Sequence, residues 1–527
     1  MLRQLFAKAV KVFWFLPGFL LWASYPPMGE MTDCLFALAP LLWLSRNADT
    51  KTAVRRWFVN GFIFWFATLS WMPAIVKNGG PWPLVVLGWG ALSAYCAAYF
   101  AAFGYLSSKV WSFAKERGYG WRLASLIVAE PLLWAGLEIV RSRLFGGFAW
   151  NQLGVVPAVG GFGAPAALGG VYLLSMVVIL INGTIASIAE RIMSSGSGVP
   201  RWARSIETLL PFALIWGLYA VSAGHVSHSE EGSKTLRVAM VQRNFPCVFM
   251  RGEKEDPVNA YRNLLSNVSP LQPELVVLAE SAFAEIGRFG SQNSILFADW
   301  MRRESGAKGV LAGCIRIDDG KEYNSAALYG EGPAQVYDKV HLVPFGEFIP
   351  GDKRITALQK LAPVGSCTPG ELKTLDFGGV KLGVAICFED TDSAQIRRLA
   401  AMGAQALVFI TNDSWFSYSD EAVQHAWQSV ARSVETGLPV IRVGNSGVTG
   451  TVMPTGGIGG ISWLVGSDGK PLVDARGTMF DRIAVKDRST GPTPYTVLGD
   501  APIFISFLAL LAACLFATRL PLRVPHP

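Results

Sequence analysis

Apolar residues dominate the first part of this chain and a short stretch near its end, whereas the region between them mixes polar and apolar positions. The long apolar runs cover residues 13–25, 34–45, 58–76, 83–106, 123–140, 170–189, 208–224 and 502–520. A helix needs about 20 apolar residues to cross a bilayer. The first two runs are shorter, and the break "YPPMGE" between them predicts a helical hairpin. The pattern therefore predicts about eight membrane spans.

The composition agrees with a membrane protein that carries a globular insert. Of the 527 residues, 51% are hydrophobic and only 16% are charged, against about 25% charged in a typical soluble domain. We expect seven helices in 1–225, a globular domain over 232–500, and a last helix with a cytoplasmic tail over 501–527. The first run follows basic residues as a signal peptide does, but "WASYPPMGEM" is a poor cleavage site, so we expect a retained anchor.

Lysine and arginine alternate between rich and poor connections, and this sets the orientation of the helices. The N-terminus, the second, fourth and sixth connections and the C-terminal tail are basic, while the first, third and fifth connections carry few positive charges or none. Both termini are then cytoplasmic, and the domain after the seventh run lies outside the cytoplasm. The net charge of +7 is mostly this orientation signal. Because no basic stripe interleaves with aromatic residues, no nucleic-acid partner is expected.

The cysteines and histidines give no metal-binding pattern. The chain has seven cysteines, no CxxC pair, and only five histidines. Cys34, Cys96 and Cys514 fall in the apolar runs, where packing is the ordinary role of a cysteine. We therefore expect no metal site and no cofactor.

Short β-branched runs alternate with amphipathic segments in the globular region. The runs expected to be strands are 236–242, 274–281, 309–317, 325–330, 381–389, 406–413 and 439–447. The segments expected to be helices are 255–268, 291–304, 392–403 and 421–436. Strands interleaved with helices predict a layered α/β domain, whose sites usually form at the carboxyl ends of strands. Glu280, Cys387, Asn412 and Asp413 stand at such ends.

The stretch "GVAICFED" places Cys387 directly before two carboxylates, Glu389 and Asp390. Nearby negative charge disfavours a thiolate, so Cys387 is either core packing or a nucleophile served by a cation and a base from elsewhere in the chain. The segment "YDKVHLVPFGEFIP" carries Lys339 and Glu347 and is too apolar for a free loop. A lysine there favours the thiolate and offers N–H groups to an oxyanion, and a glutamate can take the thiol proton. The sequence therefore favours a buried Cys–Glu–Lys cluster.

The order "LAES", "YDKVHLVPFGEFIP", "AICFED" and "TNDSWF" resembles the carbon–nitrogen hydrolase (nitrilase) superfamily, whose triad is Glu, Lys and Cys in that order. Eight spans around an extracytoplasmic domain of this kind resemble one branch, the apolipoprotein N-acyltransferase family of the bacterial inner membrane. The resemblance implies a nitrilase-like αββα sandwich for 232–500 beside a multi-span α-helical membrane domain. It also implies that Glu280 is the base, Lys339 the oxyanion-stabilising cation and Cys387 the nucleophile.

Further residues resemble supporting positions of the family, and two positions depart from it. The supporting residues are Glu347, Glu389 and Asn324. Phe388 stands where the family usually has tyrosine, and Arg251 stands near a place where members often carry tryptophan. Both departures concern the lining of the acyl pocket rather than the triad.

Several aromatic residues are candidates for binding substrate. They are Phe388, Trp415, Phe416, Tyr418 and Trp150. Trp150, in "FGGFAWNQLG", is either an interface anchor or part of the lining where lipid reaches the site. The aromatics after "TND" are candidates for a lid that contacts lipid. Asp413 and His425 are expected to be structural.

The resemblance implies a two-step transfer within the membrane. Cys387 takes an acyl chain from a phospholipid as a thioester, and the α-amine of a diacylglyceryl-cysteine on an apolipoprotein then takes it from Cys387. The protein would be a multi-pass protein of the bacterial inner membrane with a periplasmic catalytic domain. Two alternatives stay open: a membrane-anchored amidase or lipid hydrolase that uses water, and a transporter with a sensory outer domain. The transporter would use ionisable residues within its spans, here Glu130 and Glu138.

Overall fold

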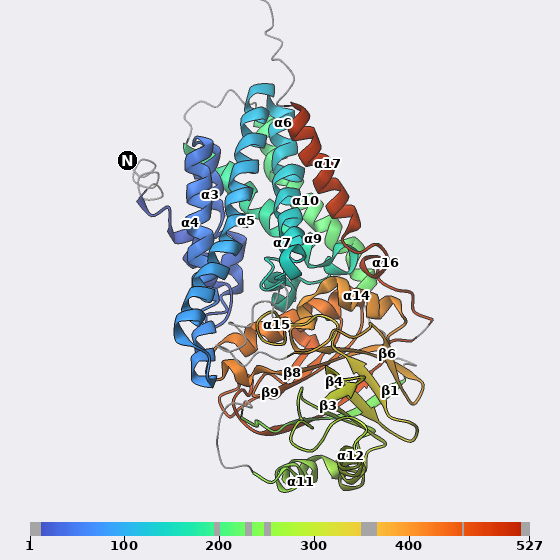
Figure 1. The fold of residues 1–527 in the computed structure, drawn as a ribbon. Coiled ribbons are helices and arrows are strands. Elements are labelled where there is room, and N and C mark those ends of the chain that lie inside the picture. Colours follow the sequence, from blue (N-terminus) through green and yellow to red (C-terminus); the bar gives the residue numbers. More distant parts are fainter. Residues whose placement is uncertain are drawn as a thin grey trace, which may run out of the picture.

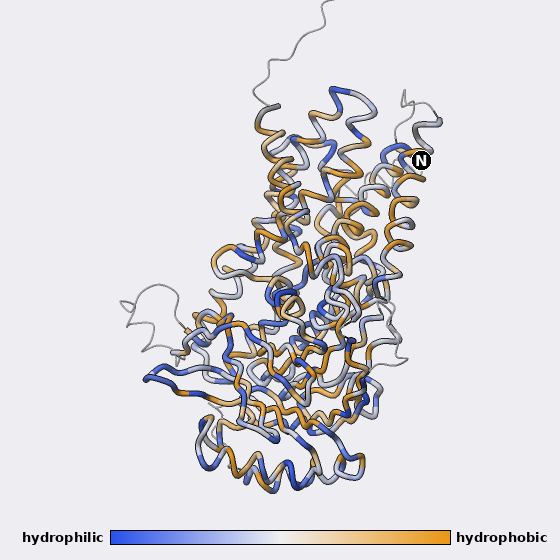
Figure 2. Tube along the Cα trace, turned by 90° about the vertical axis from the view of Figure 1, so that its right-hand side faces the viewer, coloured by the Kyte–Doolittle hydropathy of each residue, from blue (hydrophilic) through white to orange (hydrophobic). Residues whose placement is uncertain are grey.

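The structure is a computed structural model that describes residues 12–193, 201–226, 234–246, 255–348, 366–455, 458–487 and 489–517. A bundle of helices forms one half of the molecule, and an α/β domain forms the other (Figure 1). Hydrophobic residues line the helices of the bundle and the inner strands, while the outermost loops and helices of the α/β half are largely hydrophilic (Figure 2). Arg251 and the basic residues before 12 and after 517 lie outside the described residues.

Within the described residues, each of the predicted apolar runs contains helical structure. The bundle consists of α2 (Leu16–Ala23), α3 (Ala39–Arg46), α4 (Thr50–Thr68), α5 (Trp82–Arg117), α6 (Tyr119–Ala124), α7 (Glu130–Arg141), α8 (Val155–Pro157), α9 (Ala166–Met193), α10 (Arg201–Val226) and α17 (Ala501–Ala517). Short 3-10 or π turns join or extend several of them, including η1 (Met31–Leu35), η2 (Met72–Asn78), η3 (Ser125–Ala129), η4 (Leu144–Gly146) and η5 (Ala158–Phe162). Among the described residues, 5 helices are long and apolar enough to cross a membrane. Because α2, α3 and α17 are shorter, the number of eight spans stays a prediction.

Two buried carboxylates inside the bundle have partners of their own. Glu130 pairs with Arg46 and accepts a hydrogen bond of 2.7 Å from the Ser107 hydroxyl. Glu138 accepts hydrogen bonds from the Trp134 indole N–H at 3.0 Å and from the Leu153 N–H at 2.9 Å. Ionisable groups in an apolar bundle need such partners. The contacts of Glu130 join α7 to α3 and α5, and those of Glu138 join α7 to the loop that carries Leu153.

The α/β half contains two six-stranded sheets. The first has the order β12-β1-β2-β3-β4-β5, with β1 (Thr235–Gln242), β2 (Leu275–Leu278), β3 (Gly309–Asp318), β4 (Lys321–Tyr329), β5 (Gln335–Asp338) and β12 (Gly477–Ala484). The second has the order β11-β10-β9-β8-β7-β6, with β6 (Thr374–Phe377), β7 (Val380–Ile386), β8 (Ala406–Asn412), β9 (Val440–Asn445), β10 (Gly450–Val452) and β11 (Ile461–Trp463). The inner pairs β1–β2, β2–β3, β7–β8 and β8–β9 are parallel.

The two sheets pack face to face between two pairs of helices. Alternate residues of the inner strands, such as Val238 and Val384, meet in a core between the sheets. The other face of the first sheet packs under α11 (Pro257–Val268) and α12 (Gln292–Ser305), and the other face of the second packs under α14 (Ser393–Ala401) and α15 (Glu421–Thr436). Strands buried on both faces read as continuous apolar runs, which explains the pattern of the sequence. The expected αββα sandwich is confirmed.

The predicted elements match the inner layers and miss the edges. The seven predicted strand runs correspond to β1, β2, β3, β4, β7, β8 and β9, and the four predicted helices correspond to α11, α12, α14 and α15. The strands that were not predicted are β5, β6, β10, β11 and β12. Four of them have only three or four residues, and β12 is a half-exposed edge strand that carries Asp481 and Arg482. Apolar runs of that length and polarity do not stand out from loops.

Helix α15 joins the two halves. It covers the second sheet on one side and packs against α9 on the other, between the bundle and the strands (Figure 1). Glu435 accepts a hydrogen bond of 2.8 Å from the N–H of Val171 at the start of α9. Asn78, at the end of η2, donates to the carbonyls of Ser414 and Trp415 at 3.0 Å and 2.7 Å. One apolar core therefore runs without a break from the bundle to the outer face of the second sheet.

Candidate active site

The structure brings the three predicted residues to one end of the sandwich. Glu280 lies two residues after β2, Lys339 directly after β5, and Cys387 directly after β7. These strands belong to two different sheets, so the site forms where the carboxyl ends of both sheets meet. Packing of the sheets, rather than any local motif, thus determines how close the three side chains lie.

Lys339 is the centre of a buried polar cluster. Its side chain is 1% exposed, and its Nζ lies 2.9 Å from Glu347 Oε1 and 3.8 Å from Glu280 Oε1. Asn324, on β4, bridges the two carboxylates through hydrogen bonds of 2.7 Å from its Nδ2 to each. The second oxygen of Glu347 accepts a hydrogen bond of 2.8 Å from the Val343 N–H. The cluster therefore fixes the ammonium group and both carboxylates in one arrangement.

The three charged groups of this cluster have shifted pKa values. Burial opposes the charge on Lys339, but Glu347 and Glu280 outweigh it and raise the pKa of the lysine. Burial raises the pKa of Glu280, Lys339 opposes this, and Glu347 adds to it. Burial also acts on Glu347, but Lys339 and the hydrogen bonds outweigh it and lower its pKa. Lys339 and Glu347 therefore form the stable ion pair, and Glu280 is the carboxylate with the greater affinity for a proton.

Cys387 begins a strained turn. Its φ of 54° lies in the left-handed region, which residues with a side chain rarely adopt. The turn continues as the 3-10 helix η7 (Cys387–Thr391). Burial and the charge of Glu280 raise the pKa of the thiol well above its usual value, while Lys339 and a hydrogen bond with Thr411 oppose that rise. The thiol is therefore protonated at neutral pH, and it needs a base before it can attack.

Glu389 ties the Lys339 segment to the Cys387 turn. Its carboxylate is fully buried and accepts hydrogen bonds from the N–H groups of Val340 at 2.7 Å, His341 at 2.9 Å and Ile386 at 2.8 Å. The Tyr337 hydroxyl donates to the same group at 3.0 Å. Glu389 thus links the residues that follow Lys339 with the residue that precedes Cys387. Its place in the site is to position both.

An aromatic stack stands beside the turn. Phe388 stacks on Phe148 and on Trp150, with ring centroids 6.1 Å and 6.4 Å apart and interplanar angles of 17° and 7°. Trp150 is 2% exposed, and its indole N–H donates to Gln424 Oε1 at 3.0 Å. A tryptophan buried in this way is not an exposed interface anchor. The loop of the bundle that carries Phe148 and Trp150 therefore packs against the Cys387 turn through Phe388.

The aromatic residues after β8 point in different directions. Phe416 packs edge-on against Trp71 of the bundle, with ring centroids 4.7 Å apart. Trp415 is partly buried, and its carbonyl is held by Asn78. Tyr418 is 80% exposed, and its N–H donates to Asp474 at 2.7 Å. The structure brings Phe416 to the junction with the bundle and leaves Tyr418 on the surface.

Three further residues near the site were given no role by the sequence alone, although Tyr337 and Thr411 each begin one of the motifs "YDKVHLVPFGEFIP" and "TNDSWF". Thr411 contacts the thiol of Cys387, and Tyr337 holds Glu389. Gln424 uses both ends of its amide: its oxygen accepts from Trp150 and Asn151, and its nitrogen donates to the carbonyls of Pro26 and Thr68. For Gln424, the signal in the sequence was the run of polar residues on helix α15. Because α15 is buried, these polar groups need hydrogen-bond partners.

Comparison with known proteins decides the family. Residues 17–184 match the family model of the apolipoprotein N-acyltransferase N-terminal domain, and residues 299–485 match the carbon-nitrogen hydrolase model. A protein of Geobacter metallireducens named apolipoprotein N-acyltransferase is 32% identical over 470 residues, which cover 85% of this chain and 86% of that relative. The chain belongs to the apolipoprotein N-acyltransferase family. A relative of the same name from Photobacterium profundum is 28% identical over 508 residues, which cover 92% of this chain and 90% of that protein.

Two solved structures can be aligned with part of the chain. A mutant of an amidase from Nesterenkonia AN1 is 19% identical and covers 52% of this chain and 98% of its own, with a TM-score of 0.36. A carbon-nitrogen hydrolase from Helicobacter pylori G27 is 18% identical and covers 55% of this chain and 97% of its own, with a TM-score of 0.34. Membership in the apolipoprotein N-acyltransferase family makes the chain an acyltransferase of the carbon–nitrogen hydrolase superfamily. Its apolar helices make it a membrane protein.

Proposed function

We propose that this enzyme moves an acyl chain from a phospholipid to Cys387 and then to the α-amine of a diacylglyceryl-cysteine on an apolipoprotein. The observation that carries the proposal is the buried Lys339 between Glu280 and Glu347, at the same edge of the sandwich as Cys387. This arrangement supplies a base, a fixed cation and a nucleophile, which are the parts that acyl transfer through a thioester requires.

In the first step, Glu280 takes the proton of the Cys387 thiol as the sulfur attacks the ester carbonyl of the phospholipid. The ammonium group of Lys339 stabilises the negative charge that develops on the carbonyl oxygen. The tetrahedral intermediate then expels the lyso-phospholipid alkoxide, which takes the proton from Glu280. A thioester on Cys387 remains.

In the second step, the α-amine of the lipoprotein attacks the thioester carbonyl. Glu280 accepts a proton from the amine, the tetrahedral intermediate collapses, and the thiolate leaves and is reprotonated. The product is an amide, so the lipoprotein carries a third acyl chain. The half-buried rings of Phe148 and Phe388, backed by the buried Trp150, offer an apolar surface to the acyl chain during both steps.

The location of the reaction is part of the proposal. The charge pattern of the sequence supports a catalytic domain on the outer side of the bacterial inner membrane, with seven helices before it and one after it. At that position, phospholipid and lipoprotein reach the site from the outer leaflet. The residue bounds 1–225, 232–500 and 501–527 describe the same organisation.

Mass spectrometry of the purified enzyme tests the chemistry. Incubation with phospholipid alone should leave one acyl group on Cys387, and addition of a diacylglyceryl lipopeptide should remove it and yield the triacylated product. Cys387→Ala should give neither species. Cys367→Ala is the matched control, because Cys367 is also partly exposed in the same domain and its pKa is raised to about 11, mainly by burial. An acyl group on the Cys387→Ala variant would refute the assignment, and loss of the group to water at the rate of transfer would favour a hydrolase.

A further inference from the structure

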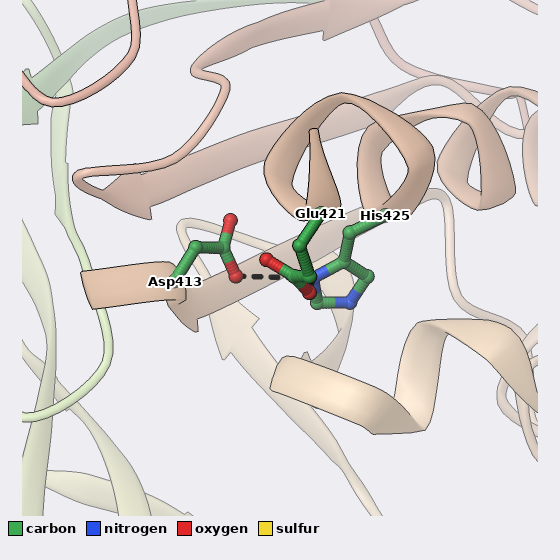
Figure 3. A group of neighbouring side chains, drawn as sticks. All are labelled: Asp413, Glu421 and His425. Carbon is green, nitrogen blue, oxygen red and sulfur yellow. Dashed lines mark hydrogen bonds and ion pairs between the residues drawn. The ribbon is translucent and has the colours of Figure 1, made fainter. Parts of the chain in front are cut away.

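A buried polar cluster lies behind the Cys387 turn, and the acyl-transfer steps do not use it. Its members are ionisable side chains from η7, η8 (Asp413–Phe416), α15 and β9, none more than 3% exposed: Asp390, Asp413, Glu421, His425 and Arg442. Figure 3 shows Asp413, Glu421 and His425, which point toward one another from the end of β8 and from α15. Charged groups in such a place must be paired or hydrogen-bonded, so the cluster has a defined protonation state.

Both ring nitrogens of His425 face a carboxylate. Nδ1 lies 3.0 Å from Asp413 Oδ1, and Nε2 lies 3.0 Å from Asp390 Oδ1. Nε2 also lies 3.3 Å from the carbonyl oxygen of Cys387. A neutral imidazole has one N–H donor and one lone-pair acceptor, so a neutral ring would turn its lone pair toward one of the two carboxylates. With Asp390 and Asp413 both ionised, only the ring with both nitrogens protonated satisfies the two contacts.

The remaining groups of the cluster balance this charge. Arg442 pairs with Asp390 and lies 3.6 Å from Asp413 Oδ2. The two cations, His425 and Arg442, therefore match Asp390 and Asp413. Glu421, whose Oε1 lies 3.6 Å from His425 Nδ1, is then neutral and protonated.

The pKa shifts agree with this count of charges. Burial would lower the pKa of His425, but Asp390 and Asp413 outweigh it and raise that pKa to about 10. Burial raises the pKa of Glu421 well above its usual value, and Asp413 adds to the rise. Burial also acts on Asp390, but His425 and Arg442 outweigh it and lower its pKa. The Trp150 ring is tilted by 40° against His425, with the two ring centroids 5.4 Å apart.

We propose that His425 is a permanently protonated positioning residue that holds the Cys387 turn through the Cys387 carbonyl and Asp390. The turn needs such a contact because Cys387 has a left-handed φ of 54°. Asp390 is fixed in turn by Ser429 at 3.0 Å and by Arg442. His425 touches no reacting atom. The proposal rests on the proposed role of Cys387 as nucleophile.

A metal ion is the competing explanation of the same side chains. One ligand atom each from Asp413, Glu421 and His425 lie within 4.8 Å of one another. A metal would require an unprotonated Nδ1, whereas the proposal requires an N–H there. The two explanations therefore differ in a property that can be measured on the intact enzyme.

Nitrogen-15 NMR of the full-length protein in nanodiscs, labelled at histidine, measures that property. The expected result is one imidazolium signal that does not titrate between about pH 5.5 and about pH 8.5, the range in which an ordinary histidine loses its charge. The signal should vanish in His425→Gln and persist in His225→Gln, a control at the exposed end of α10. For the signal that His425→Gln removes, a neutral ring or a midpoint near pH 6.5 would overturn the proposal, and so would one equivalent of metal in the purified protein by elemental analysis.

Single-turnover kinetics test the positioning role. His425→Gln should form the acyl-enzyme about 100-fold more slowly, the usual consequence of a small displacement of a reacting group, with an unchanged KM for phospholipid. His225→Gln should match the wild type. A rate for His425→Gln within about twofold of wild type overturns the role, since a displaced nucleophile must slow the chemical step. If His425→Gln does not fold, the NMR result on the wild type alone decides whether the proposal holds. Transfer by Cys387→Ala would instead refute the proposed function and leave the NMR result standing.

Discussion

Glu389→Gln should strongly slow acyl-enzyme formation, although the substitution only replaces one carboxylate oxygen by an NH₂ group. The carboxylate of Glu389 accepts from three backbone N–H groups, those of Val340, His341 and Ile386, and from the Tyr337 hydroxyl. A glutamine offers one oxygen and one NH₂ group. Val340 and His341 donate to Oε1, and Ile386 donates to Oε2. In either orientation of the amide, the NH₂ group therefore faces at least one buried backbone N–H, which is left without an acceptor.

The size of the effect follows from that mismatch. A buried N–H without an acceptor costs about 1–3 kcal/mol. The chain can relieve this penalty by separating the Lys339 segment from the Cys387 turn, and the separated state is inactive. A shift of that size changes the ratio of the competent to the separated state about 5- to 150-fold, because each 1.4 kcal/mol corresponds to about a factor of ten. We expect acyl-enzyme formation to slow by this factor.

Single-turnover labelling with a phospholipid, read by mass spectrometry, measures the rate. Tyr337→Phe is the matched control: it removes one donor and leaves the carboxylate, so it should slow the reaction far less. Burial raises the pKa of Glu389, although the hydrogen bonds and Lys339 oppose the rise. A Glu389→Gln enzyme with the wild-type rate would mean that Glu389 is protonated in the native state, and the reasoning would be refuted.

Four further predictions concern the neighbouring residues. Lys339→Arg should lose transfer as fully as Lys339→Ala, because a planar guanidinium does not fit the buried place of an ammonium; a near-normal rate would leave Lys339 only a structural ion pair. Glu347→Gln should fold, yet slow both steps, since Glu347 holds Lys339 at 2.9 Å; accumulation of the thioester would assign Glu347 to the second step alone. Because the pKa of Glu280 is raised, kcat/KM for acyl-enzyme formation should fall with decreasing pH through a midpoint above 4.5, and a midpoint at or below that value contradicts a buried base. Trp150→Ala should raise the KM for phospholipid by roughly tenfold, because Phe388 loses about 0.5–1.5 kcal/mol of ring contact with Trp150 in addition to buried area and is no longer held in place for the acyl chain; an unchanged KM would show that Trp150 does not support lipid binding.

The sequence predicted the parts of the fold that are buried on both faces. Runs such as those of β1, β7 and β8 contain little besides apolar residues, and their interleaving with α11, α12, α14 and α15 indicated the sandwich. The edge strands β5 and β12 escaped because half-exposed strands carry polar residues and follow no simple period. Their positions depend on pairing with distant strands, as when β12 pairs with β1, and a single sequence holds no direct record of such pairing.

The candidate site, like the fold, could be predicted from the sequence only in part. Glu280, Lys339 and Cys387 could be proposed because each follows a strand and because their order resembles a family. The close approach of Trp150 to Phe388 depends on how the bundle sits on the sandwich, so the sequence left two roles open for Trp150. The partnership of Asp390 with Arg442 joins residues 52 positions apart, and a lone buried arginine in a strand gave no signal of its partner.

The protonated thiol of Cys387 has a consequence for inhibitor chemistry. Reagents that select cysteines by their thiolate, such as simple haloacetamides, will react slowly with this residue, because burial and Glu280 keep the sulfur neutral. A selective covalent inhibitor has to use the base that the enzyme provides, and it must present an ester-like carbonyl to Glu280 and Lys339 together. Screening by thiol reactivity will therefore miss Cys387, whereas acyl-group mimics with an apolar tail will find it.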